Sequence, residues 1–182
     1  LQLSERASYD FLSQLYNRST FERELKSEIE RSAHAKVAVL FIDVDDFKFI
    51  NDRFGHSVGD EVIKYVAGCI KQRVKGSGFA GRFGGDEFVL CITDPKQIEE
   101  IESLSLDLID ELYEGYHSEL ANVSINVKAS IGIAFFPEHG DDSDKIVAAA
   151  DEAMYFVKKN GKANYHIYQP EDSQIADLQH TL

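Results

Sequence analysis

Two groups of acidic residues stand out in this sequence because apolar residues surround them. Asp43, Asp45 and Asp46 close the apolar stretch KVAVLFIDVD, and Asp86 and Glu87 follow a glycine pair in GRFGGDEFVL. Two carboxylates a few ångströms apart repel each other unless a cation lies between them. Hard oxygen ligands suit Mg²⁺ or Mn²⁺, and Mg²⁺ in turn suits phosphates. If both groups share one edge of a sheet, they indicate a metal-assisted reaction on a phosphate-bearing substrate.

Each of these features also has a purely structural interpretation. Aspartates at the end of a strand often cap the next helix. The pair Gly84-Gly85 is typical of a tight type I′ hairpin turn with positive φ angles, and the acids beside it then only keep the turn hydrated. Lys158 and Lys162 lie at the end of a predicted helix, where the helix dipole favours cations. It is the joint presence of these residues that favours a functional site.

The elements that must position these residues follow from hydrophobic periodicity. The continuous apolar run before Asp43 predicts a strand buried on both faces. Before this strand we expect a helix from Thr20, which can cap it. After the strand we expect a short helix with a glycine turn over 47–60, a helix over 60–74 and two strands over 79–92. A helix over 94–115, a strand over 123–137, a helix over 146–159 and a strand over 164–170 complete the predicted order.

A hairpin within this order makes the sheet mixed, so the predicted fold class is α/β. Helices covering one face of such a sheet give a two-layer α+β sandwich of ferredoxin-like type, with a central β-hairpin and helices packed on the sheet. We expect one domain over 10–169, a linker helix over 1–9, and a tail or connection over 170–182.

Composition excludes several classes of protein. The formal net charge of −13 repels phosphate backbones, so we expect no nucleic-acid partner. The longest apolar run is too short to span a bilayer, and we expect a cytoplasmic domain without direct membrane contact, although a longer parent protein could be membrane-anchored. The string GSGFAG follows a predicted helix rather than a strand, so it is not a dinucleotide-binding loop. Zinc-ligand spacings and serine-hydrolase motifs are missing from the sequence.

Four blocks of the sequence together resemble the GGDEF family, the diguanylate cyclase domains of bacteria. They are YDFLSQLYNRSTF, FIDVDDFKFINDRFGHSVGDEVI, RFGGDEF and ASIGIAFFPEHGDDSDKIVAAADEAMYFVKKNGKANY, and they cover most of the chain from Asp10 to Tyr168. The resemblance implies a fold like nucleotide cyclase domains and the polymerase palm. It also implies a reaction in which two GTP molecules, held by two facing protomers, condense to cyclic di-GMP and two pyrophosphates.

The resemblance also implies roles for individual residues. Asp43, Asp86 and the backbone carbonyl of Val44 match the metal ligands, for Mg²⁺ or Mn²⁺, and Asp86 with Glu87 matches the acidic pair needed for catalysis. The other matches are the guanine readers Asn51 and Asp60, the phosphate contacts Lys48, Lys158 and Lys162, and the glycines Gly84 and Gly85, which leave room for the nucleotide backbone.

Three departures from the family pattern bear on function. Ser13 and Gln14 replace the usual Thr and Gly, which concerns a turn more than the chemistry. Lys162 stands where Arg is common and lacks the fork that grips phosphate at two points. The R-x-x-D product site is missing, because that stretch begins at Lys75 and ends at Gly78. We therefore expect a diguanylate cyclase without product inhibition at Lys75. The alternative is a catalytically weak GTP-binding module that regulates a neighbouring sensor or output domain.

Overall fold

The computed structural model describes residues 8–173 of the chain. Its elements are α2 (Arg18–Glu30), β1 (Val37–Val44), α3 (Phe47–Phe54), α4 (His56–Val74), β2 (Gly78–Gly84), β3 (Glu87–Thr93), α5 (Ile98–Glu114), β4 (Tyr116–Ser118), β5 (Val123–Ile125), β6 (Ala129–Phe136), α6 (Ser143–Lys159) and β7 (Tyr165–Ile167). The order agrees with the predicted alternation of helices and strands.

A five-stranded mixed sheet in the order β2-β3-β1-β6-β7 forms the centre of the domain. Strand β1 pairs antiparallel with both β3 and β6, and β7 joins β6 in parallel. The β2–β3 hairpin therefore lies directly beside β1, as the sequence predicted. This pairing places the end of β1 next to the hairpin turn, with Asp43 opposite Glu87.

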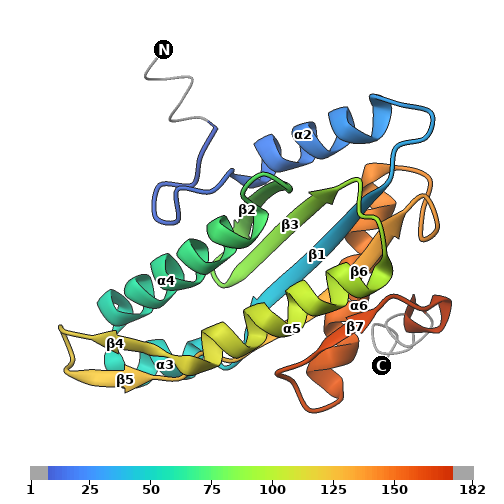
Figure 1. Cartoon of the computed structure of the whole chain (residues 1–182). Helices are drawn as coiled ribbons and strands as arrows, with labels where there is room; N and C mark the ends of the chain where they lie inside the picture. Colours follow the sequence, from blue (N-terminus) through green and yellow to red (C-terminus); the bar gives the residue numbers. More distant parts are fainter. Residues whose placement is uncertain (1–7, 174–182) are drawn as a thin grey trace.

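Helices pack on both faces of this sheet. On one face, Ala38, Leu40 and Ile42 of β1 pack in a core with residues of α4 and α5, which cross the front of the sheet in Figure 1. On the other face, Val39 and Phe41 pack with residues of α2 and α6. The predicted mixed sheet, central hairpin and packed helices are confirmed. The prediction placed helices on one face only, whereas the structure has helices on both faces, because the apolar strand β1 is buried on both of its faces.

The close contact between α6 and β6 depends on Gly132. A Cβ atom at this position would lie 2.0 Å from the Ala150 carbonyl oxygen and 2.2 Å from the Met154 backbone nitrogen. Small residues on the helix, including Ala149 and Ala153, are buried along the same contact. The helix therefore lies directly on the sheet, and its last turn, with Lys158, reaches the end of β1.

Several local predictions need correction. The predicted strand over 123–137 is two strands, β5 and β6, and β4 pairs with β5 in a small second sheet. Helix α5 begins at Ile98 rather than at residue 94. The N-cap of α2 is Asn17, whose side chain accepts a hydrogen bond from the Thr20 amide, so Thr20 is not the cap.

The hairpin turn also differs from the prediction. Neither Gly84 nor Gly85 has a φ angle in the left-handed region, so the turn is not type I′. Gly85 and Asp86 form the turn, and the register shifts between Arg82 and Gly84. A bulge of this kind re-aims side chains near the end of a hairpin.

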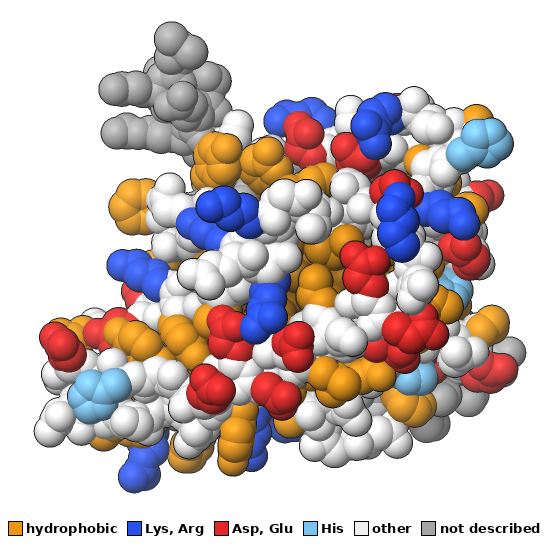
Figure 2. Space-filling view, in the orientation of Figure 1, with side chains coloured by type: hydrophobic (Ala, Val, Ile, Leu, Met, Phe, Trp, Pro, Cys, Tyr) orange, Lys and Arg blue, Asp and Glu red, His pale blue; other side chains and the backbone are white. Residues whose placement is uncertain are grey.

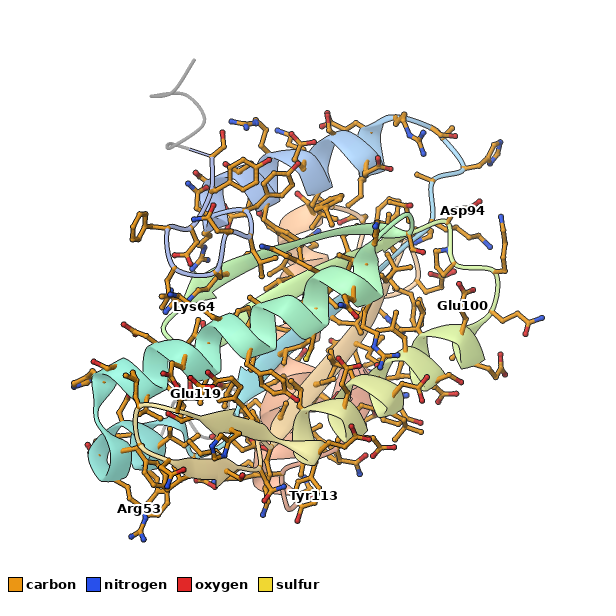
Figure 3. The ribbon with its side chains drawn as sticks, turned by 60° about the vertical axis from the view of Figure 1, so that its left-hand side comes forward. Arg53, Lys64, Asp94, Glu100, Tyr113 and Glu119 are labelled. Atoms are coloured by element: carbon orange, nitrogen blue, oxygen red, sulfur yellow. The ribbon has the colours of Figure 1, made fainter. Side chains whose placement is uncertain are left out.

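The two ends of the sheet carry different segments. Figure 3 shows Arg53 of α3 at one end, and Asp94 and Glu100 at the opposite end. The acidic groups predicted to be functional lie at the end with α3. The predicted linker helix lies mostly outside the described residues; within them, Tyr9 forms an isolated bridge with Tyr16. Residues 170–173 form a helical turn, and the remaining predicted tail lies outside the described residues.

Candidate active site

The site is built around Asp43 and Asp86. Asp43 is the last residue of β1 that pairs with β3. The backbone amide of the next residue, Val44, donates a hydrogen bond to the Asp86 carbonyl oxygen at 3.1 Å. This backbone contact ties the end of β1 to the hairpin turn. The two carboxyl groups are close enough for Asp86 to perturb the ionisation of Asp43. The two acidic groups therefore share one edge of the sheet.

The ionisation of Asp43 is costly in this setting. Burial raises the pKa of Asp43, and the neighbouring Asp86 carboxyl raises it further, to about 7, against the opposing effect of Lys158. Water reaches 18% of the Asp43 side chain, and its Oδ1 atom is buried without a hydrogen-bond partner among the described residues. A buried acceptor without a donor costs free energy unless another group satisfies it. The local excess of negative charge therefore favours a bound cation.

The donor set fits a hard divalent ion that also contacts substrate. Across residues 8–173, no cluster of three or more His, Cys, Asp or Glu side chains could hold a metal by itself. Asp43 and Asp86 supply two carboxylates, and the Val44 carbonyl adjoins them along the chain. Mg²⁺ is commonly bound by one or two carboxylates together with substrate phosphates. This site has the composition for that kind of binding rather than for a closed protein cage.

Arg82 holds the hairpin turn in place. Its guanidinium donates to the Gly85 carbonyl at 2.7 Å and to the Gly84 carbonyl at 3.2 Å. The same group forms an ion pair with Asp10 at 3.1 Å. Burial alone would raise the pKa of Asp10, but hydrogen bonds from Ser13 and Arg82 outweigh it and lower that pKa. The turn that presents Asp86 is thus fastened to the loop before α2.

That loop contains one of the departures noted in the sequence. Gln14 has a φ of 59°, a left-handed conformation that glycine adopts most readily. The Gln14 backbone amide donates a hydrogen bond to the Asp10 carbonyl at 2.9 Å, which closes the loop. The substitution at this position does concern turn geometry, as predicted.

Glu87 faces a different part of the site from Asp86. It lines a groove of about 320 Å³ together with Arg18, Phe83 and Asp151, between α2 and α6. The Arg18 guanidinium lies over the Phe83 ring at 5.0 Å. Glu87 is also opposite Asp43 in the sheet register. The acidic pair therefore has two distinct surroundings, a feature that the sequence did not indicate.

The two predicted phosphate-binding lysines of α6 and the following turn point toward the end of β1. Lys158 Nζ lies 2.6 Å from Asp45 Oδ1 and 3.4 Å from Asp43 Oδ2. Lys162 Nζ pairs with Asp46 at 2.9 Å, and this pair raises the pKa of the exposed Lys162. Both cations therefore lie at the edge where the acidic groups meet.

The predicted guanine readers lie on the α3–α4 pair. Asn51 is on α3, and a Cβ atom added to Gly59 of α4 would lie 1.8 Å from its Oδ1 atom. Asp60 is the next residue of α4 and is exposed. Lys48 is exposed on the first turn of α3. These three residues lie on helices that follow β1 directly, and no described contact joins them to the carboxylate pair.

The predicted glycines are open toward the outside. A Cβ atom at Gly84 would only touch the Glu87 side chain at 3.5 Å, and one at Gly85 would meet nothing within 4 Å. Neither position therefore needs glycine for packing within the protein. Two further residues, Asp45 and Arg82, are placed at the site without having been assigned a role from the sequence. Their signals were the position of Asp45 within the acidic group and of Arg82 beside the glycine pair.

Acidic residues are concentrated on helix α5, whose first turn lies at the end of the sheet opposite the site. Helix α5 carries seven acidic residues and no Lys or Arg in IEEIESLSLDLIDELYE, and acidic side chains gather over it in Figure 2. In the part of the chain that the structure describes, no helix has the length and apolar character needed to cross a membrane.

Comparisons with known proteins show the family of this chain. A sequence model described as "Diguanylate cyclase, GGDEF domain" matches residues 7–164. The Pseudomonas aeruginosa protein named bifunctional diguanylate cyclase/cyclic di-GMP phosphodiesterase MucR is 33% identical, over 100% of this chain and 26% of its own length. The Escherichia coli protein named cyclic di-GMP phosphodiesterase PdeR is 31% identical, over 92% of this chain and 25% of its own length.

A solved structure is also similar over nearly the whole chain. The structure of a shortened TpbB (YfiN) from Pseudomonas aeruginosa, described as comprising only the GGDEF domain, superposes with a TM-score of 0.88 at 30% identity. The match covers 93% of this chain and 99% of that structure. The chain spans about a quarter of the length of the two curated relatives named above.

Proposed function

Since this chain belongs to the GGDEF family of diguanylate cyclase domains, we propose that it condenses two GTP molecules into cyclic di-GMP and two pyrophosphates. The observation that carries this proposal is the meeting of Asp43 and Asp86 at one edge of the sheet, where the buried Asp43 Oδ1 atom has no hydrogen-bond partner among the described residues. An arrangement of this kind is costly for a scaffold without a ligand. It is useful to an enzyme that binds a cation and phosphates there.

The proposed reaction uses the residues of this chain in three ways. Asp43, Asp86 and the Val44 carbonyl would hold Mg²⁺ or Mn²⁺, which neutralises charge on the phosphates and acidifies the attacking 3′-hydroxyl when bound. Asp86 or Glu87 accepts the proton of that hydroxyl. The new bond joins the 3′-oxygen of one GTP to the α-phosphorus of the other, and pyrophosphate leaves.

Recognition of GTP is divided between the two sides of the site. Asn51 and Asp60 bind the guanine edge, since a carboxylate accepts from its two neighbouring N–H groups and adenine has no such pair of donors. Lys48, Lys158 and Lys162 contact the β- and γ-phosphates. Gly84 and Gly85 lack side chains beside the turn, and the open space around Gly85 supports a close approach by the nucleotide.

Two partners complete the proposal. A second copy of the domain must face the first, because each protomer holds one of the two GTP molecules. The relatives MucR and PdeR are about four times as long as this chain, which supports fused sensor or output domains in the full-length protein. Those domains would control how often two copies meet.

A second candidate is a GTP-binding module that regulates a neighbouring domain. It is favoured by the relative named as a cyclic di-GMP phosphodiesterase, which matches this chain over 92% of its residues. Both acidic groups are present in this chain, which supports catalysis over regulation alone.

Incubation with GTP and Mg²⁺, followed by separation of the nucleotides, tells the two candidates apart. A cyclase yields cyclic di-GMP from the wild type and none from Asp86→Ala at the same concentration. A regulatory module retains bound GTP and yields no product from either protein.

A further inference from the structure

We propose that Asp45 is a positioning residue of the GTP site, whose buried carboxylate fixes the two phosphate-binding lysines. This inference rests on the proposed function, because it concerns the same lysines. Asp45 follows the metal-binding position by two residues, yet its side chain is 0% exposed and faces the protein rather than a ligand. Its role is therefore different from that of Asp43.

Three groups from distant parts of the chain donate to the Asp45 carboxylate. The Lys158 ammonium lies 2.6 Å from Oδ1, and the Ser130 hydroxyl donates to the same atom at 2.7 Å. The Ala163 amide donates to Oδ2 at 2.9 Å. Charge-assisted hydrogen bonds of this kind are shorter and stronger than neutral ones. One carboxylate thus joins the end of β1 to β6, to the last turn of α6 and to the turn after it.

The turn after α6 has a backbone that needs such support. Gly161, Lys162 and Ala163 have successive φ values of 105°, 62° and 49°. Residues with side chains rarely adopt this conformation, and surrounding contacts must hold them in it. The Lys162 amide donates to the Val157 carbonyl at 3.0 Å, and Asp45 fixes the Ala163 amide. Strained backbone of this kind is concentrated at functional sites.

The consequence of the turn is the direction of Lys162. Its ammonium reaches back to Asp46, the exposed residue beside Asp45, at 2.9 Å. Lys158 approaches the same edge from the helix, at 3.4 Å from Asp43. Asp45 therefore sets the position of both cations, one by a direct ion pair and one through the turn. Asp45 does not serve as the N-cap of α3, since Asp46 occupies that position. A residue that only capped α3 would also have no need to contact Lys158 or the turn after α6.

Asp45→Asn separates positioning from mere filling of space. Asparagine has nearly the same size but no negative charge, and an NH₂ group replaces one of the two carboxylate oxygens. In either orientation of the side chain, this NH₂ group cannot accept the hydrogen bond that Lys158 or the Ala163 amide donates. We expect binding of a triphosphate to weaken about tenfold, because misplaced lysines lose charge-assisted contacts with phosphate oxygens. Binding of a monophosphate should change by less than about twofold, since it lacks the β- and γ-phosphates.

The probes are 3′-deoxy-GTP and 3′-deoxy-GMP, measured by calorimetry with Mg²⁺ present. Neither has the attacking hydroxyl, so that only binding is observed. Ser130→Ala is the matched control, since it removes one donor to Asp45 without touching either lysine, and we expect its preference for triphosphate to equal that of the wild type. Thermal unfolding of each variant confirms that it is folded before binding is compared.

A double-mutant cycle gives the sharpest test of the mechanism. If Asp45 acts through Lys158, Asp45→Asn should cost much less in a Lys158→Gln background than in the wild type. Equal weakening of triphosphate and monophosphate by Asp45→Asn, or additive effects in the cycle, would overturn this inference and leave the proposed function standing. Failure of the wild type to bind 3′-deoxy-GTP would overturn both.

Discussion

Replacing Asp43 with asparagine should stabilise the protein when no divalent cation is present. The folded protein holds the Asp43 proton more tightly than the unfolded chain does, because burial and the Asp86 carboxyl raise its pKa from 3.8 to about 7. Between these values the folded state binds more protons, so stability falls as the pH rises. The destabilisation is largest above about pH 7, where Asp43 is ionised in both states.

The magnitude follows from the same pKa values. The difference between 3.8 and about 7 corresponds to ~4 kcal/mol, at ~1.4 kcal/mol for each tenfold change in proton affinity. Water reaches 18% of the side chain and screens the charge, so we expect about half of this value, ~2 kcal/mol, at pH 8. For a domain of this size, that gain raises the melting temperature by about 4–8 °C.

Thermal unfolding in the presence of a chelator measures this effect. Asp43→Asn should melt above the wild type at pH 8, with a smaller difference at pH 5. Asp52→Asn, an exposed position on α3, is the charge-matched control and should show no such pH dependence. A lower melting temperature for Asp43→Asn at pH 8, or an equal shift at both pH values, would refute the reasoning about the carboxylate pair. Added Mg²⁺ should stabilise the wild type and not the variant.

Three further predictions concern the surroundings of the site. Arg82→Ala should lower the free energy of unfolding by ~1–3 kcal/mol and reduce product formation. The reason is that the turn carbonyls lose their donor and the partly buried Asp10 loses its ion pair. Denaturant unfolding measures the stability and a cyclisation assay measures the rate, and an unchanged rate would contradict the positioning role. Gly132→Ala should cost at least ~3 kcal/mol, because its Cβ would meet α6 backbone at 2.0 Å, whereas Gly68→Ala, with open space around it, should be neutral or stabilising. Cyclic di-GMP should not inhibit through Lys75, so Lys75→Ala should leave any inhibition curve unchanged, and relief of inhibition by this variant would show the expectation to be wrong.

Local patterns in the sequence predicted the frame of the site. The continuous apolar run before Asp43 predicted a doubly buried strand, and the strands around the glycine pair predicted a hairpin. Both are confirmed, and their pairing brings Asp43 opposite Glu87. The same buried strand already required cover on both faces, which the predicted two-layer arrangement did not provide. Helices α2 and α6 supply the second cover.

Contacts between distant segments could not be predicted from periodicity. Asp45 and Lys158 are 113 residues apart, and nothing in the spacing of either residue indicates their ion pair. Arg82 and Asp10 are 72 residues apart, and the spacing of these residues does not indicate their ion pair either. The turn at Gly85 and Asp86 depends on the Arg82 contacts and on a register shift, which explains why the glycine pair alone suggested the wrong turn type.

We propose that Asp43 and Asp86 form the centre at which two GTP molecules condense between two protomers. The most direct measurement is the initial rate of cyclic di-GMP formation from GTP and Mg²⁺ across a series of protein concentrations, with pyrophosphate measured in parallel. We expect two pyrophosphates for each cyclic di-GMP, activity per protein that rises with protein concentration, and no product from Asp86→Ala. Bound GTP without product at the highest concentration, or equal product from Asp86→Ala, would contradict this proposal.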